Sequence, residues 1–136
     1  MMAKTVHVPD FVKETDGTVF KQAADGATLP AGTYYADFGP GLERSSFIGP
    51  HFIWDGVIVA SGVTFEGTGF FDADIKAATG AASGWDVEAA GTAFAIAAAA
   101  GQNKQHWVEF CSHRARAKVV VTTQGKLRLS IATKGA

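Results

Sequence analysis

Apolar and polar residues alternate with a period of two over several short stretches of the chain, which is the pattern of β-strands that bury one face. We predict strands over residues 5–8, 18–21, 33–38, 46–54, 57–66, 85–88, 106–111, 116–123 and 126–133. Glycine, proline and aspartate separate these stretches, and we find no long stretch with the 3.6-residue period of a helix. The pattern predicts an all-β fold, a single antiparallel β-sandwich or jelly-roll-like domain over residues 1–136 with long Gly/Ala-rich loops.

Two regions each predict a pair of strands joined by a tight turn. The first is centred on Asp55-Gly56, a favoured two-residue hairpin turn, and the strand that follows it would direct one alternating set of residues into the core: Val57, Val59, Ser61, Val63 and Phe65. Pro50 cannot donate a backbone hydrogen bond, so it predicts a bulge or an edge position beside Gly49.

The second predicted hairpin is centred on Gln124-Gly125 and would be half buried. Its core face would carry Ala115, Ala117, Val119, Val121, Leu127, Leu129 and Ile131. Its outer face would carry Arg114, Arg116, Lys118, Lys126 and Arg128. We expect this basic face to be either a solvated strand surface, which discourages aggregation, or a surface that meets an acidic partner or a neighbouring copy.

Three segments have weaker patterns. Residues 1–45 predict a partly irregular N-terminal arm, and residues 67–84 predict a long loop with one helical turn over 72–78. Residues 93–100 are mostly alanine, which favours a helix. This stretch is short and has no capping residue, so we favour a strand there.

Composition narrows the function classes. The chain has 136 residues, of which 47% are apolar and only 18% charged, with a net charge of −1. So few charges predict exposed apolar surface, which often forms an interface. A net charge near zero argues against a nucleic-acid partner, and no aromatic residues that would stack on bases are interleaved with the basic ones.

Candidate catalytic and metal-binding residues lack the partners that such sites need. His106, Cys111 and His113 have no fourth ligand and fit no common zinc spacing. The acidic pairs Asp72/Asp74 and Asp86/Glu88 could hold a cation or flank a glycosidic bond, but no nucleophile elbow, metalloprotease motif, phosphate-binding loop or dinucleotide fingerprint occurs. We predict no enzymatic activity, no metal and no cofactor.

The sequence shows no pattern of a signal peptide or of a membrane-spanning helix. The first residues contain no apolar core of a secretory signal peptide, and no apolar run approaches the length of a spanning helix. We therefore expect neither secretion through a signal peptide nor a membrane partner. The single cysteine, Cys111, excludes a disulfide within the chain.

Trp54, Trp85 and Trp107 have two interpretations. Large aromatic side chains usually fill the core of a sandwich, and we favour that interpretation. The alternative is a carbohydrate-binding β-sandwich module. That alternative predicts an exposed tryptophan in a shallow groove beside an Asp or Glu.

Two blocks of the sequence resemble small structural proteins of tailed-bacteriophage particles. The block HWVEFCSHRARAKVVVTTQGKLRLSIATKGA has an aromatic-rich strand, an R-x-R-x-K-V-V-V strand, a glycine turn and a final strand that ends near Lys-Gly. The block FIWDGVIVASGVTFEGTGF is similar to their W-D and amphipathic strand pair.

The resemblance implies a virion protein that is assembled in the host cytoplasm and has no enzymatic role. A capsid decoration or cement protein is the role it favours, and a tail or head-completion component is the neighbouring possibility. It also implies a homo-oligomer, with a trimer favoured, that binds the major capsid protein or another virion protein. The interface candidates are Arg114, Arg116, Lys118, Lys126, Arg128, Trp54 and Trp107.

Overall fold

The computed structural model describes residues 4–38, 45–70, 72–88, 93–97, 103–105, 108–109 and 114–135. In these residues the chain forms strands and turns and no helix, which confirms the predicted all-β class. The strands are β1 (Lys4–His7), β2 (Phe11–Lys13), β3 (Val19–Phe20), β4 (Ala27–Leu29), β5 (Gly32–Asp37), β6 (Ser45–Trp54), β7 (Val59–Thr68), β8 (Asp86–Glu88), β9 (Phe94–Ile96), β10 (Asn103–Gln105), β11 (Val108–Glu109), β12 (Arg114–Thr123) and β13 (Gly125–Gly135).

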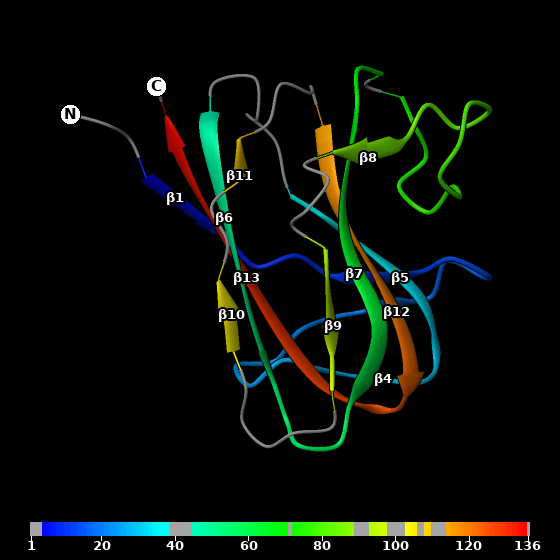
Figure 1. Ribbon diagram of the computed structural model, residues 1–136, viewed down its shortest axis with the longest axis vertical. Helices are drawn as coiled ribbons and strands as arrows, with labels where there is room; N and C mark the ends of the chain where they lie inside the picture. Colours follow the sequence, from blue (N-terminus) through cyan, green and yellow to red (C-terminus); the bar gives the residue numbers. More distant parts are fainter. Residues whose placement is uncertain are drawn as a thin grey trace.

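The strands form two antiparallel sheets that face each other (Figure 1). Sheet A has the order β1-β13-β6-β10, with β4 also paired to β13 and β11 also paired to β6. Sheet B has the order β3-β2-β5-β12-β7-β8, with β9 also paired to β7. The core lies between the sheets, as in a β-sandwich.

Both predicted hairpins are wrong, because each of the two turns carries the chain from one sheet to the other. Strand β6 lies in sheet A and β7 in sheet B, and β13 and β12 are divided in the same way. Strand β6 pairs with β13, and β7 pairs with β12, so the connections form two arches at the same end of the sandwich (Figure 1). Alternation shows which face of a strand is buried, but an arch and a hairpin satisfy it equally.

The two arches pack closely at Gly125. A Cβ atom on this glycine would lie 2.4 Å from the backbone nitrogen of Ile58, just after the turn of the other arch. Only a residue without a side chain allows this approach. Gln124-Gly125 therefore forms a turn, as predicted, but the turn connects β12 to a strand of the other sheet.

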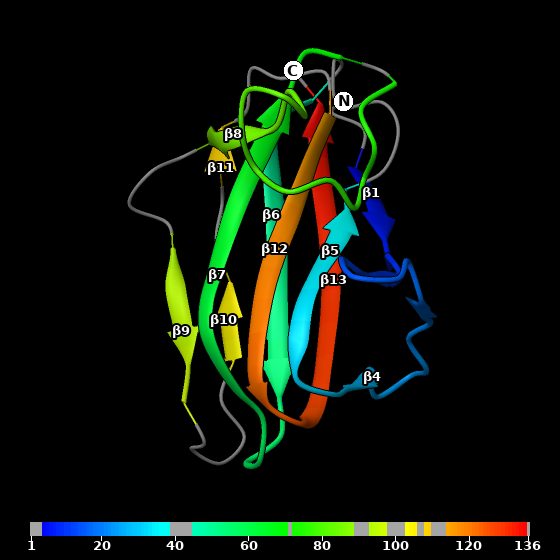
Figure 2. The same cartoon turned by 90° about the vertical axis from the view of Figure 1, so that its right-hand side faces the viewer.

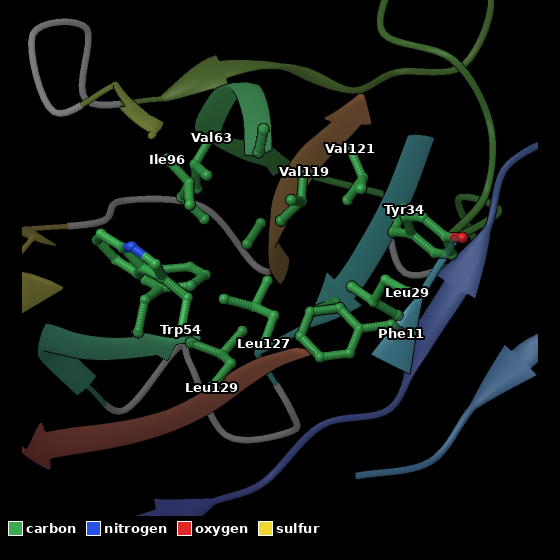
Figure 3. Close-up of a cluster of buried hydrophobic side chains, with 14 of the residues drawn as sticks. Phe11, Leu29, Tyr34, Trp54, Val63, Ile96, Val119, Val121, Leu127 and Leu129 are labelled. Carbon is green, nitrogen blue, oxygen red and sulfur yellow. The ribbon is translucent and has the colours of Figure 1, made fainter. Parts of the chain in front are cut away.

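The predicted core faces of the last two strands are confirmed. The side chains of β12 and β13 that face the core are buried: Ala115, Ala117, Val119, Val121, Leu127, Leu129 and Ile131. Figure 3 shows Leu127 and Leu129 opposite Val119 and Val121, with Trp54 on one side and Phe11 and Tyr34 on the other. Each buried aliphatic or aromatic side chain of this size stabilises the fold by about 1.5–3 kcal/mol.

The predicted core face of β7 is correct in one half only. Val63 and Phe65 are buried as expected, but Ile58 and Ala60 are buried in place of Val57 and Val59. The register with β12 shifts here, because Val120 is opposite Gly62 while Val121 is opposite Ala60. This β-bulge adds one residue and reverses the alternation.

The described part of the N-terminal segment, residues 4–38, contributes strands to both sheets, so these residues do not form the predicted, partly irregular arm. Strands β1 and β4 extend sheet A, and β2, β3 and β5 extend sheet B. Strands β1 and β4 pair with different parts of the same edge of β13, and the side chain of Gln22 pairs with the backbone of β13 between them. It donates to the carbonyl of Leu129 at 3.0 Å and accepts from the amide of Leu129 at 2.8 Å. One amide side chain therefore completes the edge of β13.

Three further predictions concern single segments. Residues 94–96 form a strand as predicted, while 98–100 lie outside the described residues. Residues 72–78 form turns in place of the predicted helical turn. On the side of β6 away from β13, β10 pairs with His51–Ile53 and β11 with Phe47–Ile48, so Pro50 falls between the two described partners. A residue without an amide hydrogen fits such an edge position.

Candidate functional site

The outer face of sheet B contains a completely buried arginine. Arg116 lies on β12 between two residues that face the core, so its own side chain points away from the core. It is nevertheless 0% exposed, because the segment between β7 and β8 folds over it. We call this segment, residues 69–85, the covering loop. Figure 2 shows it, in green, crossing in front of β12.

Strand register brings Arg116 to its charge partner. Glu66 on β7 is directly opposite Arg116 and is 1% exposed. The Arg116 Nε donates to Glu66 Oε1 at 2.9 Å, and Nη2 lies 2.7 Å from the same oxygen. Nη2 is not well directed for a second hydrogen bond, so we count it as an ion-pair contact. Two charges this deeply buried are tolerated only when they are paired.

Two aromatic rings complete the surroundings of the guanidinium group. Its central carbon lies 3.7 Å from the ring centroid of Tyr35 and 4.2 Å from that of Trp85. A cation over an aromatic face is attracted by the ring quadrupole, more strongly when water is excluded. Tyr35 and Trp85 are themselves buried, so this contact is shielded from solvent.

The same group of side chains holds the backbone of the covering loop. Three side-chain donors each reach one of three successive loop carbonyls: Arg114 Nη1 to Ala73 at 2.6 Å, Trp85 Nε1 to Asp74 at 2.9 Å, and Arg116 Nη1 to Ile75 at 2.7 Å. In addition, the Thr79 hydroxyl donates to Glu66 Oε2. Buried carbonyls need donors, and a loop has no ladder to supply them. We call Arg114, Arg116, Glu66, Tyr35 and Trp85 the arginine clamp.

Burial shifts the pKa of two side chains of the clamp, Arg116 and Tyr35. It lowers the pKa of Arg116, and the hydrogen bond from Arg116 to Glu66 opposes that change. Burial also raises the pKa of the Tyr35 hydroxyl, and a hydrogen bond to Glu14 raises it further. Tyr35 therefore stays protonated and donates a hydrogen bond to the Glu14 carboxylate. Apart from the Arg116 Nη2, whose contact with Glu66 is ionic, the polar groups of the clamp are hydrogen-bonded to the loop, to each other or, for Tyr35, to Glu14.

The interface candidates separate into three groups. Arg114 and Arg116 hold the covering loop, and Trp54 packs in the core at 8% exposure, where its ring stacks on Phe94. Those three candidates are therefore used inside the molecule. Lys118 is partly exposed, Arg128 is exposed, and Lys126 forms an ion pair of 2.7 Å with Asp25. Trp107 lies outside the described residues, as do His106, Cys111 and His113.

The described carboxylates of the acidic pairs, Asp72, Asp74 and Asp86, are not part of a metal-binding cluster. The Asp74 carboxylate binds the Lys76 ammonium at 2.7 Å, and the Asp86 carboxylate accepts from the amide of Val87. Over the described residues there is no group of three or more His, Cys, Asp or Glu that could hold a metal ion. In that same part of the chain, no helix is long and apolar enough to span a bilayer.

The outer surface of the covering loop contains a shallow groove that the sequence did not indicate. Its volume is about 420 Å³, and it is lined by Phe70, Asp72, Ser83, Gly84 and several alanines. The Phe70 side chain is 62% exposed. The sequence around Phe70 predicts only a loop rich in glycine and alanine. The groove forms because the arginine clamp holds this loop in one conformation.

Comparisons of the chain with protein-family models, with curated proteins and with solved structures found no match.

Proposed function

We propose that the chain is a non-enzymatic structural protein of a tailed-bacteriophage particle, a decoration protein that binds the capsid and strengthens it. The resemblance of its two sequence blocks to such proteins motivates the proposal. The observation that carries it further is an exposed pair on the outer face of sheet A. Ile53 on β6 is 39% exposed and lies directly opposite the exposed Arg128 on β13.

An aliphatic side chain beside an arginine is suited to a protein interface, where apolar and arginine side chains concentrate. On a sheet face, the backbone of both residues is already ordered, so a partner that covers them has to immobilise only the two side chains. We call Ile53 and Arg128 the sheet A pair. Of the basic residues predicted on the outer face of β13, Arg128 is the one that we place in this interface.

The described edges of the sheets favour contact through faces over contact through strand addition. Each described edge strand, such as β1, β3, β8 and β10, has only two to four residues. Short edges are poor templates for pairing with another chain. A decoration protein that bridges several capsid subunits through its faces gains avidity from contacts that are individually weak.

The test is binding to empty capsids of the virus that encodes the chain. We expect the purified chain to have the mass of a closed oligomer, a trimer in the first instance, by light scattering, and to co-sediment with capsids to saturation. The double variant Ile53→Glu/Arg128→Glu should weaken capsid binding at least tenfold. It replaces an apolar group and a cation with two carboxylates, which are not complementary to a surface that binds the original pair.

The matched control is Val19→Glu, which introduces a charge at an exposed apolar residue on β3 of the other sheet. It should leave capsid binding unchanged. A chain that stays monomeric and does not co-sediment with capsids would contradict the proposal. Equal losses in the double variant and in Val19→Glu would contradict the role of the sheet A pair.

A further inference from the structure

The covering loop fixes an aromatic ring at the surface. Phe70 follows β7, and its amide donates to the Thr68 hydroxyl oxygen at 3.1 Å, which sets the direction of the chain. The ring lies against Gly84, where a Cβ would be only 2.8 Å from Phe70 Cδ2. Gly84 also has φ +78°, which a side chain would disfavour. The ring is therefore supported by backbone on one side, while the side chain stays 62% exposed.

The rest of the groove is open and is lined by small side chains and a few polar ones. Small side chains, among them Ala77 and Ala82, line it and leave its volume within the usual range for ligand sites. Asp72 is exposed and lines the groove. Ser83 Oγ donates to the Gly80 carbonyl and accepts from the Trp85 amide, so its position is fixed.

From this arrangement we propose that the groove binds a neutral pyranose sugar. One face of a pyranose ring presents C–H groups, which pack on an aromatic ring, and its rim presents hydroxyl groups. The C–H face would cover Phe70, and the hydroxyls would donate to the Asp72 carboxylate. Burial of the exposed aromatic ring and charge-assisted hydrogen bonds both favour the complex.

The carboxylates at the groove favour a neutral sugar over an apolar side chain of a partner protein and over an acidic sugar. An apolar side chain of a partner protein would desolvate the Asp72 carboxylate without giving it a hydrogen-bond donor, which costs free energy. An acidic sugar would place its carboxylate near Asp72 and Asp74, and the like charges would repel. A neutral sugar supplies donors and has no charge.

The arginine clamp makes the groove a preformed site. It holds the carbonyls of Ala73, Asp74 and Ile75 in place before any ligand arrives. Ligand binding then does not have to order the loop, which is the main cost in mobile loop sites. This inference is independent of the proposed capsid role.

The experiment is saturation-transfer NMR on the full chain with methyl β-D-glucopyranoside, methyl β-D-galactopyranoside and N-acetylglucosamine at millimolar concentration. We expect transfer to the ring C–H protons of at least one of the three. The variant Phe70→Ala should weaken that binding at least tenfold, and Asp72→Asn should weaken it several-fold. Glucuronate should give less transfer than methyl β-D-glucopyranoside.

Val57→Ala is the matched control, because Val57 is 58% exposed on the arch between β6 and β7 and its truncation leaves the groove intact. It should bind sugar like the original chain. The proposal is overturned if none of the three sugars shows transfer, or if binding survives Phe70→Ala. It is also overturned if Phe70→Ala changes the oligomer mass and leaves sugar binding unaltered, because the groove would then be a protein contact.

Discussion

Asp55 connects the two arches through hydrogen bonds from one carboxylate. Its Oδ1 accepts from the amides of Val57 at 3.1 Å and Ile58 at 2.9 Å, and its Oδ2 accepts from the amide of Lys126 at 3.0 Å. The amide of Asp55 also donates to the carbonyl of Lys126 at 3.2 Å. Asp55, which the sequence places in a hairpin turn, therefore joins two turns that are distant in the sequence.

The protonation of Asp55 should make part of the stability depend on pH. Burial alone would raise its pKa, but the hydrogen bonds from Ile58, Val57 and Lys126 outweigh burial and lower the pKa below 3.8. Because the folded pKa is below the unfolded one, the stabilisation is complete above about pH 4 and is lost as pH falls through the folded pKa. Asp55→Asn should therefore lower the free energy of unfolding by about 1–2 kcal/mol at pH 7 and by less near pH 3.

Urea denaturation of both chains at the two pH values measures this difference. Asp10→Asn is the control, since it removes a carboxylate at an exposed residue between β1 and β2. A loss that is the same at pH 7 and pH 3 would show that Asp55 acts through packing and not through its charge.

The covering loop is the element whose position depends most on side chains. It runs over β12, and Lys76 near its middle contacts the turn between β2 and β3, where a Cβ on Gly17 would lie 3.4 Å from Lys76 Cδ. Apart from the isolated bridge between Gly80 and Trp85, the described residues of the loop form no strand. The arginine clamp supplies the donors that strand pairing would otherwise provide.

Arg116→Met should release this loop. The substitution leaves Glu66 buried without its cation, which is expected to cost about 3–5 kcal/mol of stability. It also removes the donor to the Ile75 carbonyl, so trypsin should cleave after the exposed Lys76 faster than in the original chain. The double variant Arg116→Met/Glu66→Gln should recover part of the stability, because the unpaired charge is then absent.

Limited proteolysis followed by mass spectrometry locates the cleavage site. Lys118→Met is the matched control, because Lys118 lies two residues further along β12 and is only partly covered. It should leave cleavage after Lys76 unchanged. An unchanged rate after Lys76 in Arg116→Met would mean that the clamp is not what holds the loop.

At the scale of the whole molecule, the two surfaces proposed for binding lie on opposite sheets. The sheet A pair belongs to β6 and β13, and the groove belongs to the loop that covers β12 in sheet B. The strands of the central pairs are far apart in the sequence, so both surfaces rest on a core of non-local contacts. Each surface depends on the same core and on different surface residues.

The two surfaces should therefore behave independently. Phe70→Ala should leave capsid binding unaffected, and Ile53→Glu/Arg128→Glu should leave sugar binding unaffected, because distant sites without shared partners are additive. Capsid co-sedimentation and saturation-transfer NMR on both variants check this. Loss of both activities in either variant, with the fold intact, would show that the surfaces are coupled.

Sequence pattern determined the class of the fold and the inward faces of β12 and β13. The alternation of Ala117, Val119 and Val121 with polar residues is a local property, and burial of one strand face follows from it directly. The turn residues Asp55 and Gly125 were also readable, since turn chemistry depends on a few neighbours. The all-β class followed from the same local signals, but the short strands β2 and β4 were not predicted from them.

Only the tertiary structure decided which strands pair and which polar residues reach the surface. An arch and a hairpin have the same alternation, so the pairing of β6 with β13 had no local signal. The bulge near Gly62 reversed the face of β7 by one residue. Arg116 and Arg128 have equivalent places in the pattern, yet one is buried and the other exposed. The difference arises because a distant loop covers only one of them, and alternation along a strand carries no information about what lies on its outer face.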